Sequence, residues 1–210
     1  MSATTRAPAG LDVEHPTNGR PATVDPRHPL ADDGKLEPNG RWASFTPGVT
    51  AGEFFSRGIV AGLAAGLVFV LIEMAWLSHL GKPAVAPLLA FSTIFTGASA
   101  PTAIAAQIPL DAITGFVVHL NLAMAFGLGF LPIVALLARI RRSNAAMLAV
   151  AGLAYGCLLY VINFGIFSSI AFPAFTAPGS PQGFLFLVHA LYGLLLAPFF
   201  IGMLRRLRPR

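Results

Sequence analysis

The sequence predicts an all-α integral membrane protein, a four-helix bundle made of two tandem helical hairpins. Three observations support this fold class. Hydrophobic residues make up 55% of the 210-residue chain and charged residues only 11%, whereas a soluble domain carries about 25% charged residues. Four apolar stretches are each long enough to cross a bilayer. Basic clusters stand before, between and after these stretches, where they all fall on one side of the membrane.

The first 52 residues predict a disordered cytoplasmic tail, and residues 53–210 predict the transmembrane domain. The tail is polar and rich in Pro, Gly, Ala, Asp and Arg, so it has no periodic apolar face that could offset the entropy of ordering it. It also lacks the apolar core of a secretory signal peptide.

Four membrane spans are expected, at about 57–80, 112–138, 144–170 and 182–204. Each has about 20 residues or more, enough to cross a hydrocarbon core of about 30 Å. The outer loop 81–111 is too apolar for a free aqueous loop, and its prolines make it too broken for a further span. We expect an interfacial or re-entrant helix near 85–97 in this loop.

The positions of the basic residues predict the orientation. Arg57 precedes the first span, RIRR (139–142) separates the second from the third, and RRLRPR (205–210) follows the fourth. The positive-inside tendency places all of these, and therefore both termini, in the cytoplasm. We expect a multi-pass protein of the cell inner (plasma) membrane. The basic charge has the pattern of membrane topology, so no nucleic-acid partner is expected.

Two short patterns recur in the same order, which predicts an internal repeat. VAGLAAGLVFVLIEMAWL begins at Val60 and VAGLAYGCLLYVINFGIF at Val150, while FVVH ends at His119 and FLVH at His189. Each unit contains an out-and-back hairpin, so the copies share one orientation. Their relation would be the parallel type of repeat.

Small residues at helical spacing predict the faces on which the helices pack. Steps of four place small residues on one side of a helix, and such stripes let membrane helices approach closely. The predicted packing residues are Gly58, Gly62, Gly66, Ala123, Gly127, Gly152, Gly156, Gly193 and Ala197.

Polar residues on the same stripes predict an intramembrane cluster. At about 1.5 Å per residue, they lie about 24 to 30 Å from the cytoplasmic ends of their spans, so they share one level. An ionisable residue at such a depth costs a few kcal/mol and is a functional candidate. The predicted members are Glu73, His119, Asn163 and His189, with Tyr160 and Tyr192 as further hydrogen-bond donors.

Several chemistries fit this cluster. His119, His189 and Glu73 could bind a transition metal, or the two histidines could be axial ligands of haem b. Glu73 with either histidine could relay protons or gate an ion or small solute. An interhelical hydrogen-bond network would satisfy the same groups without chemistry. No triad order, Walker loop or dinucleotide fingerprint indicates an enzyme, so no catalytic residue is assigned.

The histidine of the second span, YVINFGIF in the third and HALYG in the fourth resemble a group of uncharacterised small four-helix bacterial membrane proteins. The resemblance covers about residues 57–204. It implies the architecture, with a histidine on helices two and four, and no known activity.

The leading hypothesis is a small membrane protein or accessory subunit that handles protons, ions or a small solute. The alternatives are a haem- or metal-binding redox protein that uses His119 and His189, and a purely structural membrane subunit. Because four helices are few for a transporter, we expect a homo-oligomer or a place in a larger membrane complex.

Overall fold

The computed structural model describes residues 49–97, 101–140, 142–172, 175 and 181–207. Within these ranges the regular structure is helical. Four helical segments are long and apolar enough to cross a membrane: Ala51–His79, Ile108–Arg139, Ala145–Phe167 and Gln182–Leu207. The predicted all-α, multi-pass architecture is therefore confirmed. The predicted tail lies outside the described residues except for its last four.

Helix α1 (Ala51–His79) begins earlier than the predicted span because its first turn is capped. The side-chain oxygen of Thr50 accepts a hydrogen bond from the Glu53 amide at 3.0 Å, which satisfies one of the free amides at a helix start. The helix ends at His79, and Gly81, two residues further on, has a φ of 70° that favours glycine. Lys82 N then donates to the Leu77 carbonyl at 2.9 Å.

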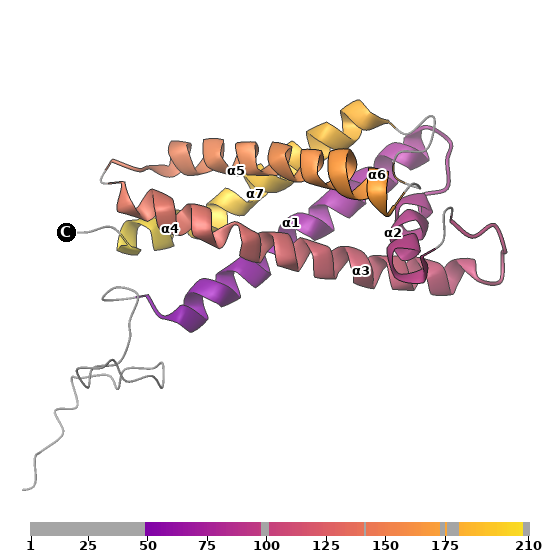
Figure 1. Ribbon diagram of the computed structural model, residues 1–210, viewed down its shortest axis with the longest axis horizontal. Coiled ribbons are helices and arrows are strands. Elements are labelled where there is room, and N and C mark those ends of the chain that lie inside the picture. Colours follow the sequence, from indigo (N-terminus) through magenta and orange to yellow (C-terminus); the bar gives the residue numbers. More distant parts are fainter. Residues whose placement is uncertain (1–48, 98–100, 141, 173–174, 176–180, 208–210) are drawn as a thin grey trace, which may run out of the picture.

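Helix α2 (Ala86–Thr96) lies in the outer loop, within the segment for which a short helix is expected. It packs against α3 (Ile108–Gly129) so closely that a Cβ on Gly115 would overlap the Leu88 carbonyl oxygen. Figure 1 shows α2 at one end of the bundle, across the ends of the long helices. Its predicted position at the lipid interface remains a prediction.

The second span is bent. Instead of one continuous helix over 112–138, the structure has α3 followed by α4 (Leu131–Arg139), separated at Phe130. Pro132 explains the break, since it has no amide to donate to the carbonyl of Leu128 and its ring crowds the preceding turn.

The third span changes helix type near its C-terminal end. It begins as α5 (Ala145–Tyr160), continues as a seven-residue π-helix, η1 (Val161–Phe167), and ends as the short helix α6 (Ser168–Ile170). The sequence predicted a regular helix over 144–170. The π-helix contains Asn163, and such segments are frequent at functional sites.

The start of α1 and the end of α7 (Gln182–Leu207) are joined by one ion pair. Glu53 pairs with Arg57 at 3.1 Å and with Arg206. Arg57 also donates to the Phe199 carbonyl at 3.0 Å. Both helix ends therefore lie at the same end of the bundle (Figure 1).

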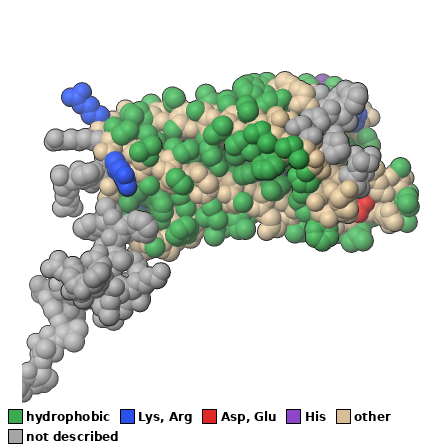
Figure 2. Space-filling view, viewed as in Figure 1, with side chains coloured by type: hydrophobic (Ala, Val, Ile, Leu, Met, Phe, Trp, Pro, Cys, Tyr) green, Lys and Arg blue, Asp and Glu red, His purple; other side chains and the backbone are tan. Residues whose placement is uncertain are grey.

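The long outer surface between the two ends is apolar. Figure 2 shows hydrophobic side chains along the visible face, with the most prominent Lys and Arg side chains at one end. Large exposed hydrophobic side chains occur on all four spans, among them Leu71, Val117, Val150 and Leu187. A surface of this kind is suited to contact with lipid.

Helices α1 and α3 touch backbone to backbone. A Cβ on Gly62 would overlap the Ala123 carbonyl oxygen, and one on Gly127 would overlap the Gly58 carbonyl oxygen. A Cβ on Gly66 would overlap that of Ala123. These predicted packing residues all lie on the contact between the two helices.

Helices α5 and α7 meet in the same way. A Cβ on Gly152 would overlap the Gly193 carbonyl oxygen, and one on Gly156 would overlap the His189 carbonyl oxygen. Ala197, one turn below Gly193, is also buried. Each helix pair therefore closes at a stripe of small residues.

We expect Gly62→Ala to destabilise the protein, because the added methyl group must push α1 away from α3. Overpacking of this kind costs about 1–3 kcal/mol. Gly202→Ala is the control, since a Cβ there meets no atom within 4 Å. Thermal unfolding in detergent micelles should show a lower midpoint for Gly62→Ala than for the wild type, and an unchanged midpoint for Gly202→Ala. Equal midpoints would contradict the close contact.

Candidate functional site

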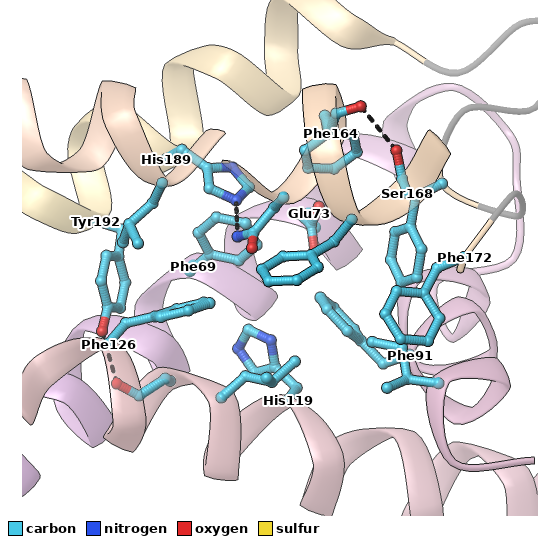
Figure 3. Close-up of a pocket in the computed structure, with 17 residues that line it drawn as sticks. Phe69, Glu73, Phe91, His119, Phe126, Phe164, Ser168, Phe172, His189 and Tyr192 are labelled. Atoms are coloured by element: carbon cyan, nitrogen blue, oxygen red, sulfur yellow. Dashed lines mark hydrogen bonds between the residues drawn. The ribbon is translucent and has the colours of Figure 1, made fainter. Parts of the chain in front are cut away.

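A cavity of about 290 Å³ lies inside the bundle, at the level where the polar cluster is expected. Helices α1, α2, α3, η1 and α7 contribute to its wall, as Figure 3 shows. Its polar side chains are Glu73, His119, Asn163, Ser168, His189 and Tyr192. Its described phenylalanines number seven, namely Phe69, Phe91, Phe126, Phe164, Phe167, Phe172 and Phe175. The structure therefore brings all four principal members of the predicted cluster to one cavity.

His119 links α3 to α1. Only 5% of its surface is exposed, and its Nε2 lies 2.8 Å from the Gly66 carbonyl oxygen. Because a carbonyl oxygen can only accept, Nε2 carries the proton and donates it. The close approach of the two helices at Gly62 and Ala123 makes this bond possible. The neutral ring then keeps Nδ1 as its acceptor.

His189 is held differently. Its Nδ1 donates to the Leu185 carbonyl, one turn earlier in α7, at 2.8 Å. The Asn163 amide on η1 lies 3.4 Å from its Nε2 and donates to that nitrogen. This bond is long and therefore weak. Both ring nitrogens of His189 are thus occupied by protein groups.

The Phe69 ring lies against both imidazoles. Its centroid is 5.5 Å from that of His119 and 4.9 Å from that of His189. Phe91 contacts the other side of the cluster, with its ring 4.6 Å from His119. In Figure 3 the two histidines extend into the cavity from opposite sides, with aromatic rings between and beside them.

Glu73 is the buried acid of the cavity, and one of its carboxylate oxygens lacks a hydrogen-bond partner, as does the hydroxyl of Ser143 elsewhere among the described residues. Glu73 is only 6% exposed, and among the described residues its Oε2 has no hydrogen-bond partner. Leaving a buried polar group unpaired costs about 1–3 kcal/mol, and more for a charged one. Glu53 differs in all these respects, since it lies at the bundle end and has two arginine partners.

Glu73 also lines a second, smaller cavity of about 140 Å³. Trp76 and Phe184 also line it and stack with their ring centroids 4.7 Å apart. Trp76 is 37% exposed, so this cavity reaches toward the outer surface. Glu73 is therefore positioned between an inner and an outer space.

The two predicted tyrosines have different roles. Tyr192 lines the cavity and donates from its hydroxyl to the Ala123 carbonyl at 2.7 Å, which links α7 to α3. Tyr160 does not line it, and its hydroxyl donates to Gln182 at 3.0 Å. Its hydroxyl thus bonds to Gln182 at the start of α7 and not to the polar cluster, while its ring packs edge-on against His189 with centroids 5.8 Å apart.

The residues do not fit the proposed metal or haem site. Among the described residues no group of three or more His, Cys, Asp and Glu side chains could hold a metal ion. Two axial histidines must direct their Nε2 atoms at one iron. Here Nε2 of His119 bonds to Gly66 and Nε2 of His189 bonds to Asn163, while Phe69 contacts both rings.

The aromatic wall and the outer cavity are features that the sequence analysis missed. Phe164 and Phe167 stand beside Asn163 in the YVINFGIF segment, and Phe69 precedes Glu73 by one turn. This spacing places aromatic rings beside the predicted polar residues, so the sequence could have indicated this part of the aromatic wall. Phe91, by contrast, reaches the cavity only because α2 folds back on α3.

No protein-family model, curated protein or solved structure matches this chain. The resemblance to small four-helix bacterial membrane proteins therefore remains an expectation. The site has to be interpreted from its own geometry.

We expect Tyr192→Phe to destabilise the protein by about 0.6 kcal/mol, and by no more than about 1.7, as for other interhelical hydrogen bonds in membranes. The variant keeps the ring that contacts Phe69 and loses only the bond to Ala123. Tyr160→Phe is the matched comparison and should cost less, because its hydroxyl bonds near the bundle end. Unfolding in mixed micelles measures both values. A larger loss in Tyr160→Phe would contradict this ranking.

Proposed function

We propose that this multi-pass membrane protein handles a proton or a small solute at its internal cavity, with Glu73 as the group that receives it. The observation that carries the proposal is the buried Oε2 of Glu73, which has no partner among the described residues and lines two adjoining cavities. An ionisable group inside a membrane span marks a solute or proton pathway by default.

The histidines support Glu73 in this proposal. His119 is bonded across the helix pair to Gly66, and His189 is bonded through both of its ring nitrogens. They shape the cavity and fix the surrounding helices. A proton relay through them would require these bonds to open, whereas Glu73 Oε2 has no bond of this kind among the described residues and is free to receive the proton or solute.

A structural role is the second candidate, and the interhelical bonds of His119 and Tyr192 favour it. Such bonds contribute about 0.6 kcal/mol on average in membranes. That gain is smaller than the cost of about 1–3 kcal/mol for an unpaired buried polar group. A purely structural role therefore leaves Glu73 without an explanation. Redox and metal chemistry are not proposed, since the residues do not fit those groups.

For the setting of the protein, we propose the plasma membrane with both termini in the cytoplasm. Arg57 and Arg206 stand at the bundle end that holds both helix ends, which supports this orientation through the positive-inside tendency. Because four helices are few for a transporter, we also propose a homo-oligomer or a place within a larger membrane complex.

We further propose that the two hairpins arose by duplication. Gly62 and Ala123 meet in the first hairpin, and Gly152 and Gly193, which the sequence repeat makes equivalent to them, meet in the second. The shared register supports the repeat. The equivalent histidines have since acquired different partners.

Proton flux in liposomes tests the proposed function. We expect the wild-type protein to dissipate an imposed pH gradient several-fold faster than Glu73→Gln, which keeps the shape of the side chain and removes its acid. An internal pH-sensitive dye reports the rate, and protein-free liposomes give the background.

Asp111→Asn is the matched control. Asp111 is an acid in the first turn of α3, and it lines neither cavity. We expect this variant to keep the wild-type rate. If wild type, Glu73→Gln and Asp111→Asn all conduct at the same rate, proton passage at Glu73 is refuted.

A further inference from the structure

We propose that the internal cavity is a binding site for a small organic cation with one positive charge and a compact apolar body, for which Glu73 is the counter-ion. This inference rests on the proposed role of Glu73 as the receiving group. It adds the chemical class of the solute, which follows from the charge, the aromatic wall, the size and the access of the site.

The charge of the lining favours a cation. Glu73 is the only acid among the described lining residues, and no Lys or Arg lines the cavity. A carboxylate in apolar surroundings is stable only with a counter-charge or a proton. Neither histidine of the lining pairs with Glu73 Oε2, which has no partner among the described residues. His119 bonds instead to the Gly66 carbonyl and His189 to the Leu185 carbonyl. An anion would meet only repulsion from Glu73.

The aromatic wall adds a second attraction for a cation. Seven phenylalanines line the cavity, and the face of an aromatic ring attracts a positive charge within about 6 Å. Phe91 lines both cavities, as Glu73 does. An organic cation would therefore meet carboxylate and ring face together. Its alkyl or aryl groups would make apolar contacts with the wall, which a hydrated metal ion could not make.

The volume limits the ligand to a small molecule. At about 290 Å³, the cavity is at the lower end of ligand pockets, which range from about 300 to 1,000 Å³. A single-ring amine fits this space better than a drug-sized molecule. One carboxylate balances one charge, which excludes a diamine with both charges inside.

The outer cavity supplies a route to the site. It joins Glu73 to the stacked pair Trp76 and Phe184. Trp76 is partly exposed, and aromatic residues at membrane interfaces accommodate amphipathic molecules. An organic cation could therefore reach Glu73 between α1, α2 and α7 without crossing the close contacts of the helix pairs.

Binding of radiolabelled benzyltrimethylammonium to the purified full-length protein in lipid nanodiscs tests the proposal. This probe is a single-ring cation that cannot lose its charge. We expect saturable binding to the wild type and to Asp111→Asn. Glu73→Gln should bind about tenfold or more weakly, since it leaves the cation without its counter-charge. Phe91→Leu should bind about threefold to tenfold more weakly, because it keeps apolar volume and removes a ring face.

The uncharged isostere neopentylbenzene makes the test independent of how the variants fold. It replaces the ammonium nitrogen with carbon and keeps the shape. At equal free concentration we expect it not to displace the labelled cation from the wild type. Equal displacement would overturn the cation class while leaving a solute cavity in place. Absence of saturable cation binding to the wild type would also overturn it.

The flux experiment separates the two proposals. Cation binding with equal proton flux in wild type and Glu73→Gln would support the binding site and refute passage of protons. Flux that depends on Glu73, without cation binding, would support the proposed function and refute the ligand class.

Discussion

The close approach of α1 and α3 at Gly62 and Ala123 is the contact on which the site depends. The two backbones come so near that a single added Cβ would collide with the opposing carbonyl oxygen. Lipid provides no hydrophobic drive for helices to associate, so such packing is a main source of cohesion in a membrane. It brings the His119 ring within 2.8 Å of the Gly66 carbonyl. A wider spacing would leave that imidazole without its acceptor.

The polar side chains of the cavity differ in whether the protein itself supplies their hydrogen-bond partners. His119, His189 and Tyr192 all have backbone acceptors nearby, so each is stable in apolar surroundings without a ligand. The Oε2 atom of Glu73, by contrast, has no hydrogen-bond partner among the described residues. One acid is thus left available inside an aromatic wall, to which the π-helix of the third span contributes. Glu73 is therefore the proposed binding group, while His119, His189 and Tyr192 stabilise the helices around it.

Much of this architecture could be predicted from the sequence, because the membrane makes its rules strict. An apolar run of sufficient length must be helical, and an ionisable residue such as Glu73 or His119 must turn inward. Pro132 carried a usable signal for the bend that the prediction of a straight span overlooked. The direction of the Tyr160 hydroxyl could not be predicted, since it depends on Gln182 in another helix. The same holds for Phe91, which reaches the cavity through the docking of α2.

The central claim is that both histidines face one internal cavity with Phe69 against them. Solid-state NMR on protein in lipid bilayers, with labelled Phe and His, tests it most directly. The account predicts contacts from the Phe69 ring to both imidazoles, whose centroids lie 5.5 Å and 4.9 Å away, and their loss in Phe69→Leu. Contacts from the imidazoles to lipid acyl chains, with none to Phe69, would contradict it.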